Sequence, residues 1–149
     1  MDSVDLQRLT RFANASRRAL ETLASRPHSV FRDFPLAACG PAAELIGRLL
    51  KERFELDGSY VCGGEHPNLP RSQTHAWFES GGFIIDITHD QFSDTGVVGW
   101  VLPMDCGWHA AFGEVKRRKG YCMPSGWPMY PHDGYSAMAA ALEADDTAT

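Results

Sequence analysis

The sequence has no uninterrupted apolar run close to the roughly 20 residues that a membrane-spanning helix needs. Its first residues, Met-Asp-Ser-Val-Asp, are acidic and lack the hydrophobic core of a signal peptide. These two absences lead us to expect a cytoplasmic protein that has no membrane partner.

Basic residues are also in short supply. Lys and Arg number 14 against 19 Asp and Glu, which gives a formal net charge of −5 and a pI near 5.6. A general nucleic-acid binder normally presents a positive face to phosphate. The basic cluster Lys-Arg-Arg-Lys at 116–119 is interpreted as a solvated turn. We therefore expect no nucleic acid among the partners.

Cysteine is sparse as well. The four cysteines, Cys39, Cys62, Cys106 and Cys122, are too few for a disulfide scaffold of this size, and none forms a Cys-x-x-Cys pair. In a reducing compartment they should be thiols. At least one of them could then act as a nucleophile.

The chain is long enough for one domain with a proper core, since it has 149 residues of which 44% are hydrophobic. We divide it into an N-terminal helix over 3–25, a motif core over 34–92 and a C-terminal part over 97–145 that is rich in Gly, Pro and aromatic residues. Strands are predicted at 59–62, 76–78, 83–87, 97–102 and 111–115, and a short helix at 136–144. This pattern indicates an α+β fold with a central antiparallel sheet.

Cys39 stands where a second helix begins. The segment Cys-Gly-Pro-Ala-Ala at 39–43 opens a strongly apolar helical pattern that continues to Phe54, and Pro41 suits the first turn of a helix. The partial positive charge and free N–H groups of a helix N-terminus favour a thiolate. Cys39 is therefore the candidate nucleophile, on a helix packed against the sheet.

The stretch from Thr74 to Phe92 predicts a hairpin that turns at Gly81-Gly82. His75 opens its first strand and Asp86 lies in its second. They differ by an odd number of positions, so the turn must place both side chains on one face. Glu79 and His89 of this stretch are interpreted as surface residues.

These three residue types fit nucleophilic catalysis. Cys39 would be the nucleophile, His75 the base, and Asp86 the acid that orients the imidazole through its second nitrogen. Attack on a carbonyl would give a thioester. The backbone N–H of Cys39 is a natural donor to the oxyanion, and Gln73 and Gln91 are candidate side-chain donors.

The order of these motifs resembles the transglutaminase-like branch of the papain-like cysteine enzymes. Three segments carry the resemblance: Cys-Gly-Pro-Ala-Ala at 39–43, His-Ala-Trp-Phe-Glu at 75–79, and Ile-Ile-Asp-Ile-Thr at 84–88. The resemblance implies a papain-like core with Cys39, His75 and Asp86 as the triad. It also implies a thiol-dependent hydrolase (peptidase, amidase or deamidase) or an acyl transferase, acting on a peptide, a protein or a small amide or ester.

We expect no cofactor and no metal in such a site. Trp77 is interpreted as a packing residue that could also line the cleft. The roles of Cys62, Cys106 and Cys122 stay open.

Two other functions remain open at this stage. One is a catalytically inactive binding or regulatory module on the same fold. The other is a zinc-stabilised interaction protein, in which a four-residue set would bind the ion: Cys62, His66, Cys106 and His109.

Overall fold

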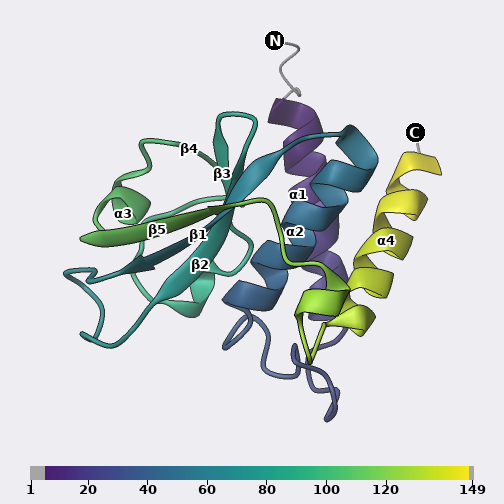
Figure 1. The fold of residues 1–149 in the computed structure, drawn as a ribbon, viewed down its shortest axis with the longest axis horizontal. Helices are drawn as coiled ribbons and strands as arrows, with labels where there is room; N and C mark the ends of the chain where they lie inside the picture. Colours follow the sequence, from purple (N-terminus) through teal and green to yellow (C-terminus); the bar gives the residue numbers. More distant parts are fainter. Residues whose placement is uncertain (1–5, 148–149) are drawn as a thin grey trace.

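The computed structural model describes residues 6–147, which form an α+β fold of one five-stranded antiparallel sheet and helices that cover it (Figure 1). The helices are α1 (Leu6–Glu21), α2 (Cys39–Phe54), α3 (Gly107–Ala110) and α4 (His132–Thr147), with 3-10 turns at His89–Gln91 and Pro124–Gly126. The strands are β1 (Gly58–Gly64), β2 (His75–Ser80), β3 (Phe83–Ile85), β4 (Val101–Pro103) and β5 (Glu114–Lys119), in the order β4-β3-β2-β1-β5. The predicted α+β class and antiparallel sheet are confirmed.

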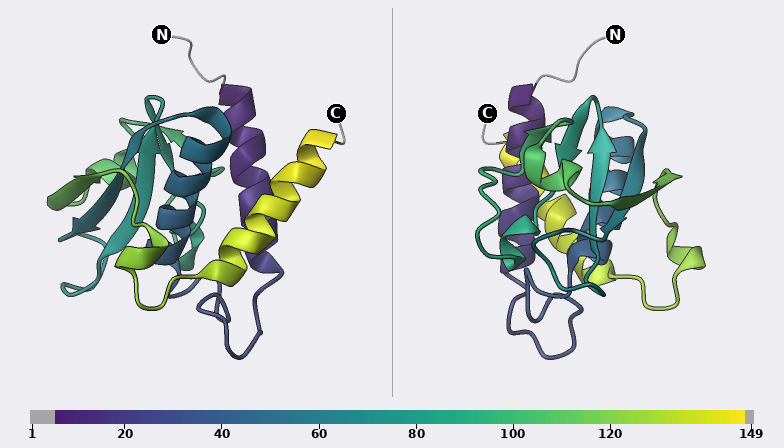
Figure 2. Two further views of the ribbon diagram at one scale, coloured as in Figure 1. Left: turned by 45° about the vertical axis from the view of Figure 1, so that its right-hand side comes forward. Right: turned by 90° about the vertical axis from the view of Figure 1, so that its left-hand side faces the viewer.

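The long helices all lie on one side of the sheet (Figures 1 and 2). Helix α2 packs on β2 and β1, while α1 and α4 pack on each other farther out. Phe78, Ile85 and Ile87 point to this side and join the main core. The predicted packing of the Cys39 helix on the sheet is therefore confirmed.

A second, smaller core lies on the other side of the sheet. It contains Val61, Trp77, Ile84, Leu102 and Phe112, with Trp108 of α3 packed against it. Since successive side chains of a strand point to opposite faces, β2 and β3 each contribute to both cores. A short helix can therefore approach the sheet from the side opposite α2.

Several predicted boundaries are corrected. The N-terminal helix predicted over 3–25 ends at Glu21, and its positions 3–5 lie outside the described residues. The strand predicted at 97–102 covers only Val101–Pro103, because Gly96 and Gly99 adopt φ values of 72° and 81° in the preceding loop. The strand predicted at 111–115 is found at Glu114–Lys119.

The basic run at 116–119 is part of this strand and is not the solvated turn that was predicted. All of β5 is exposed and it lies at one edge of the sheet. Charged side chains on an edge strand discourage pairing with a second molecule. The residues are thus solvated as expected, but in an extended backbone.

Arg17 of α1 fixes the segment that follows β3. Its guanidinium donates to the Ile87 carbonyl at 2.7 Å and to both carboxylate oxygens of Asp90 at 2.8 and 3.0 Å. The group also lies between the rings of Phe34 and Trp100, at 4.7 and 4.6 Å from their centroids. Because this segment carries Asp86, α1 helps to set the position of that carboxylate.

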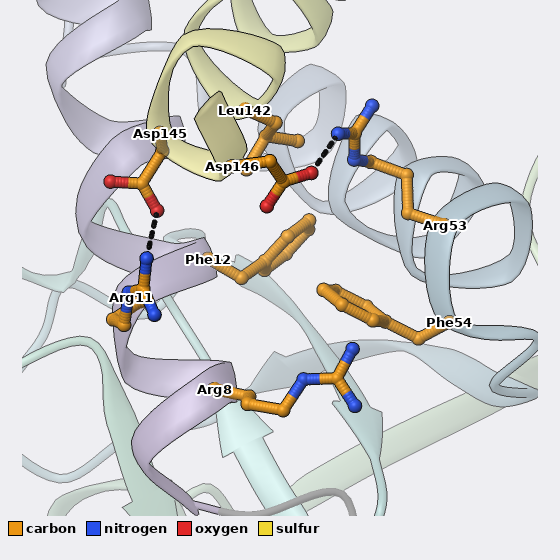
Figure 3. Close-up of a pocket in the computed structure, with 8 residues that line it drawn as sticks. All are labelled: Arg8, Arg11, Phe12, Arg53, Phe54, Leu142, Asp145 and Asp146. Atoms are coloured by element: carbon orange, nitrogen blue, oxygen red, sulfur yellow. Dashed lines mark hydrogen bonds and ion pairs between the residues drawn. The ribbon is translucent and has the colours of Figure 1, made fainter. Parts of the chain in front are cut away.

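A small pocket lies where the three long helices come together, at the C-terminal end of α2 (Figure 3). Arg11 pairs with Asp145 at 3.4 Å and Arg53 with Asp146 at 2.6 Å, while Phe12 and Phe54 form its apolar wall. Its volume is only about 50 Å³. Since Cys39 stands at the opposite end of α2, we interpret this pocket as a junction of helix ends.

Candidate active site

Cys39 is the first residue of α2 and is half-buried. The turn that starts the helix is closed by the Ala42 N–H, which donates to the Ala38 carbonyl at 2.9 Å. Pro41 stands in this first turn, where it has no N–H to leave unpaired. The N–H groups of Cys39 and Gly40 are therefore the free donors at this end of the helix, next to the thiol in sequence.

The hairpin of β2 and β3 brings His75 and Asp86 together. Ser80 pairs with Phe83 across Gly81 and Gly82, whose φ values of 62° and 83° fit a two-residue turn of type I′. Each pair in this register joins an even-numbered to an odd-numbered residue, so His75 and Asp86 share a face. Their Nε2 and Oδ2 atoms are 2.7 Å apart.

Asp86 follows β3 directly and does not lie within the strand as predicted. Its backbone N–H donates to the Trp100 carbonyl at 2.8 Å. The carboxylate is fully occupied: Oδ1 accepts from the Thr88 backbone N–H at 3.1 Å, and Oδ2 accepts from both His75 and His109 at 2.7 Å. The side chains of His75 and Asp86 are 0% and 1% exposed, so this set is closed to water.

The His75 ring has its other nitrogen, Nδ1, buried and without a hydrogen bond of standard geometry. Besides Asp86, the Cys39 thiol interacts electrostatically with the ring. Burial lowers the pKa of His75, but the charge and hydrogen bond of Asp86, and then the Cys39 thiol, raise it to about 9. An imidazolium is therefore favoured in the folded protein at neutral pH.

The pKa values of the Cys39 thiol and the Asp86 carboxyl are both lowered, as expected beside a charged His75. Burial raises the pKa of Cys39, but the interaction with the charged His75 ring and a contact from the Ala76 backbone lower it by more, so the net shift is downward. Burial also raises the pKa of Asp86, but the charge of His75 and the hydrogen bonds from His109 and His75 hold it far below its ordinary range. These shifts favour a thiolate at Cys39, an imidazolium at His75 and a carboxylate at Asp86.

Aromatic rings close the site on the side away from α2. The His75 ring centroid lies 5.1 Å from that of Phe92, 5.6 Å from that of Trp108 and 5.9 Å from that of Trp77. Trp77 and Cys39 border one tightly packed region with no room for a water molecule, and the Trp77 indole N–H donates to Glu79 Oε2 at 3.1 Å. Water is excluded from the ion pairs, which strengthens them.

The two predicted side-chain donors to an oxyanion are engaged elsewhere. The Gln73 amide donates to the Thr74 carbonyl at 2.8 Å, and the Gln91 amide to the Thr88 carbonyl at 3.1 Å. Neither contact directs the amide to Cys39. The backbone N–H groups at the start of α2 remain the donors that the fold places beside the thiol.

Tyr60 of β1 was missed by the sequence analysis. Its hydroxyl lies so close to Gly40 that a Cβ atom on this glycine would be 3.3 Å from Oη. Burial and then the negative charge of Cys39 raise the pKa of Tyr60 to about 12, so the phenol keeps its proton. No pattern in the sequence links Tyr60 to Cys39, because the contact depends on how α2 crosses β1.

His109 of α3 was also missed as a partner of the triad. It was considered only as a zinc ligand paired with Cys106. The structure keeps that local contact, with Nδ1 of His109 3.1 Å from the Cys106 sulfur, but turns Nε2 to Asp86. The Cys-x-x-His spacing was the available signal, and nothing in it indicated the carboxylate.

One group in residues 6–147 has the spacing of a metal site. The ligand atoms of His75, Asp86 and His109 lie within 4.8 Å of one another. The zinc set that the sequence suggested is not brought together: His66 bonds the Trp108 carbonyl at 2.9 Å, whereas Cys62 lines a separate pocket.

Comparisons with protein-family models, with curated proteins and with solved structures found no significant match to this chain. None of the helices in residues 6–147 is long and apolar enough to cross a membrane. The site must therefore be interpreted from its own geometry.

Proposed function

We propose that the protein is a thiol-dependent enzyme in which Cys39, His75 and Asp86 form a catalytic triad. The observation that carries this proposal is that His75 contacts both other members of the triad. Its Nε2 is hydrogen-bonded to the buried Asp86 carboxylate, and its ring interacts with the Cys39 thiol at the start of α2. A nucleophile, a base and an orienting acid are the parts that acyl transfer requires. The likeness to transglutaminase-like enzymes supports the same assignment.

The reaction begins from the thiolate and imidazolium. The Cys39 sulfur attacks a carbonyl carbon, and the resulting oxyanion accepts hydrogen bonds from the N–H groups at the start of α2 and from the Tyr60 hydroxyl. The tetrahedral intermediate then collapses, and the leaving amine or alkoxide takes the proton from His75. A thioester on Cys39 remains.

Hydrolysis completes the cycle. Water attacks the thioester carbonyl while neutral His75 accepts its proton, and the carboxylic acid product leaves as Cys39 regains the thiolate. An amine in place of water would make the protein an acyl transferase. Water needs no binding site of its own, so we favour a hydrolase acting on a peptide, protein or small amide or ester.

Iodoacetamide alkylation, mapped by mass spectrometry at each cysteine, tests this function without a known substrate. Cys39 should react with a pH midpoint below that of a free cysteine, about 8.5. In His75→Ala the midpoint should rise to that value or above, because burial remains and its compensation is lost. Cys122 is the internal control thiol.

Ordinary reactivity of Cys39 in the folded wild type, unchanged in His75→Ala, would contradict the triad. That result would favour an inactive binding module on the same fold. A thermal unfolding curve, measured on a separate sample of each variant, shows whether that variant is folded under the alkylation conditions.

A buried cation site is the second candidate, because His75, Asp86 and His109 converge. The distances favour hydrogen bonds, because each Nε2 is 2.7 Å from Oδ2. Two ligands of one tetrahedral zinc would be about 3.4 Å apart, given metal–ligand distances near 2.1 Å. A cation would also separate His75 from Asp86. Elemental analysis of the purified protein distinguishes the two candidates.

A further inference from the structure

Helix α3 is held against the sheet by contacts that leave its histidine no freedom. The His66 ring accepts a hydrogen bond from the Asn68 N–H at Nδ1, so its Nε2 donates to the Trp108 carbonyl at 2.9 Å. His109 itself is buried, and its ring makes a T-shaped contact with Trp77 with centroids 4.8 Å apart. The imidazole is therefore fixed by its neighbours before its own hydrogen bonds are considered.

The hydrogen bonds of His109 define its tautomer. Asp86 can only accept, so Nε2 of His109 carries a proton and donates it to Oδ2 at 2.7 Å. Nδ1 then accepts from the Cys106 thiol, 3.1 Å away. The other charged groups around this ring are Glu79 and Arg117, which line the adjoining cavity and pair with each other at 2.9 Å.

We propose that His109, oriented by Cys106, is a positioning residue that holds the Asp86 carboxylate against His75. This inference rests on the proposed function of Cys39. A carboxylate that follows a strand can rotate about its last bond, and two imidazoles on one oxygen with a backbone N–H on the other leave it a single orientation. His109 touches neither Cys39 nor a substrate in this role.

The site is thus nearly symmetric about Asp86. Each side has a cysteine and a histidine, with Cys39 and His75 on one side and Cys106 and His109 on the other. The two sides differ in their surroundings: Cys39 stands at the start of a four-turn helix, whereas the helix after Cys106 has only four residues. Only the first thiol is placed to react.

Two amide substitutions separate positioning from packing. Glutamine places its amide nitrogen near the Nε2 position of imidazole, so His109→Gln keeps a donor to Asp86. Asparagine places its nitrogen near the Nδ1 position, so His109→Asn loses this donor while remaining polar and uncharged. Both variants lose the ring, so thermal unfolding reports the shared packing cost.

The measurement is the pH profile of Cys39 alkylation in these folded variants. In His109→Asn the rate at pH 6.5 should fall about tenfold, the size expected when a hydrogen bond to a charged group is lost. His109→Gln should restore most of the wild-type rate. Equal profiles in wild type, Gln and Asn variants would overturn the proposal and leave His109 a packing residue.

Should His109→Asn fail to unfold cooperatively, Cys106 provides the second test. Cys106→Ala removes the donor to Nδ1 and should lower the Cys39 rate, whereas Cys106→Ser keeps a donor and should not. Unchanged Cys39 reactivity in Cys106→Ala would overturn the positioning role. Fast alkylation of Cys106 with slow alkylation of Cys39 would also overturn it.

The outcomes separate this inference from the proposed function. Ordinary reactivity of Cys39 in the wild type contradicts the triad as a whole. A reactive Cys39 that depends on His75 and not on His109 contradicts the positioning role alone.

Discussion

Asp86 accepts hydrogen bonds at both of its oxygens and donates none. The Thr88 N–H reaches Oδ1, and the imidazoles of His75 and His109 reach Oδ2. All of these partners are donors, so the charge of the carboxylate is met from every side. This set makes Asp86 the residue on which the site depends for both structure and charge.

We predict that Asp86→Asn destabilises the protein and removes the low pKa of Cys39. The asparagine amide has the shape of the carboxylate, but its NH₂ group must face either Thr88 N–H or the two imidazoles, so donor meets donor. An unsatisfied buried donor costs about 1–3 kcal/mol. Urea denaturation should show a loss of this size, and the pH midpoint of Cys39 alkylation should rise.

The control for this substitution is Asp57→Asn. The Asp57 carboxylate pairs with Lys51 beyond the C-terminal end of α2 and its side chain is 74% exposed, so its loss should leave the Cys39 profile unchanged. A wild-type Cys39 midpoint in Asp86→Asn would argue that the carboxylate does not act through His75.

Among single residues, the sequence predicted those whose surroundings follow from a local sequence pattern. Cys39 was found from its helix start, and His75 and Asp86 from one hairpin. Glu79 and His89 were predicted to be exposed and are buried, because Arg117 pairs with Glu79 and the Gly99 carbonyl bonds His89. Such compensating partners are distant in sequence, and no period or spacing reveals them.

Helix α2 approaches the sheet closely over β2. Gly47 of α2 faces the Phe78 ring, and a Cβ atom on this glycine would lie 2.7 Å from Cζ of the phenylalanine. The helix can therefore lie nearer to the sheet here than a side chain would permit. That distance brings the start of α2, and with it Cys39, to the end of β2 where His75 stands.

We predict that Gly47→Ala destabilises the protein although alanine favours helix. The helix propensity gain is about 1 kcal/mol, and overpacking costs about 1–3 kcal/mol. Urea denaturation should show a net loss, and Phe78→Leu in the same chain should recover part of it by removing the ring. Gly107→Ala, whose methyl meets nothing within 4 Å, is the matched control.

Element prediction was best where one period dominates. The helices α1 and α2 and the paired β2 and β3 follow from apolar spacing and the Gly-Gly turn. Helix α4 begins at His132 and not at 136, because the Tyr135 N–H bonds the Pro131 carbonyl and extends it backward. Helix α3 was missed, since its four residues are too few to show a helical period.

At the scale of the whole molecule, the site lies where the two cores of the sheet meet. His75 and Asp86 stand at the edge of the face that carries Trp77, while Cys39 comes from the helices on the other face. The folded protein therefore has two pKa shifts of opposite sign, upward at His75 and downward at Cys39. Folding binds a proton at His75 and releases one at Cys39, so each shift contributes to stability with its own dependence on pH.

The signs of these contributions differ. The pKa of His75 is raised in the folded state, from 6.5 to about 9, so its contribution is complete below pH 6.5 and is lost as pH rises toward 9. The pKa of Cys39 is lowered from 9.0, so its contribution is present above pH 9 and is lost as pH falls through the lower folded value. Between these limits the proton gained and the proton released cancel.

We therefore predict that the free energy of unfolding of Cys39→Ala, relative to wild type, falls as pH rises above 6.5. His75 keeps its raised pKa in this variant because Asp86 is its strongest charge partner, while the compensating thiolate is gone. The slope should approach 1.4 kcal/mol per pH unit, about one proton. Urea denaturation between pH 6 and 9 measures it, and Cys39→Ala with His75→Ala should show no such slope. A free energy of unfolding of Cys39→Ala that stays flat across this range would mean that folding does not bind a proton at His75, and a flat difference between Cys39→Ala and wild type would mean that folding releases no proton at Cys39.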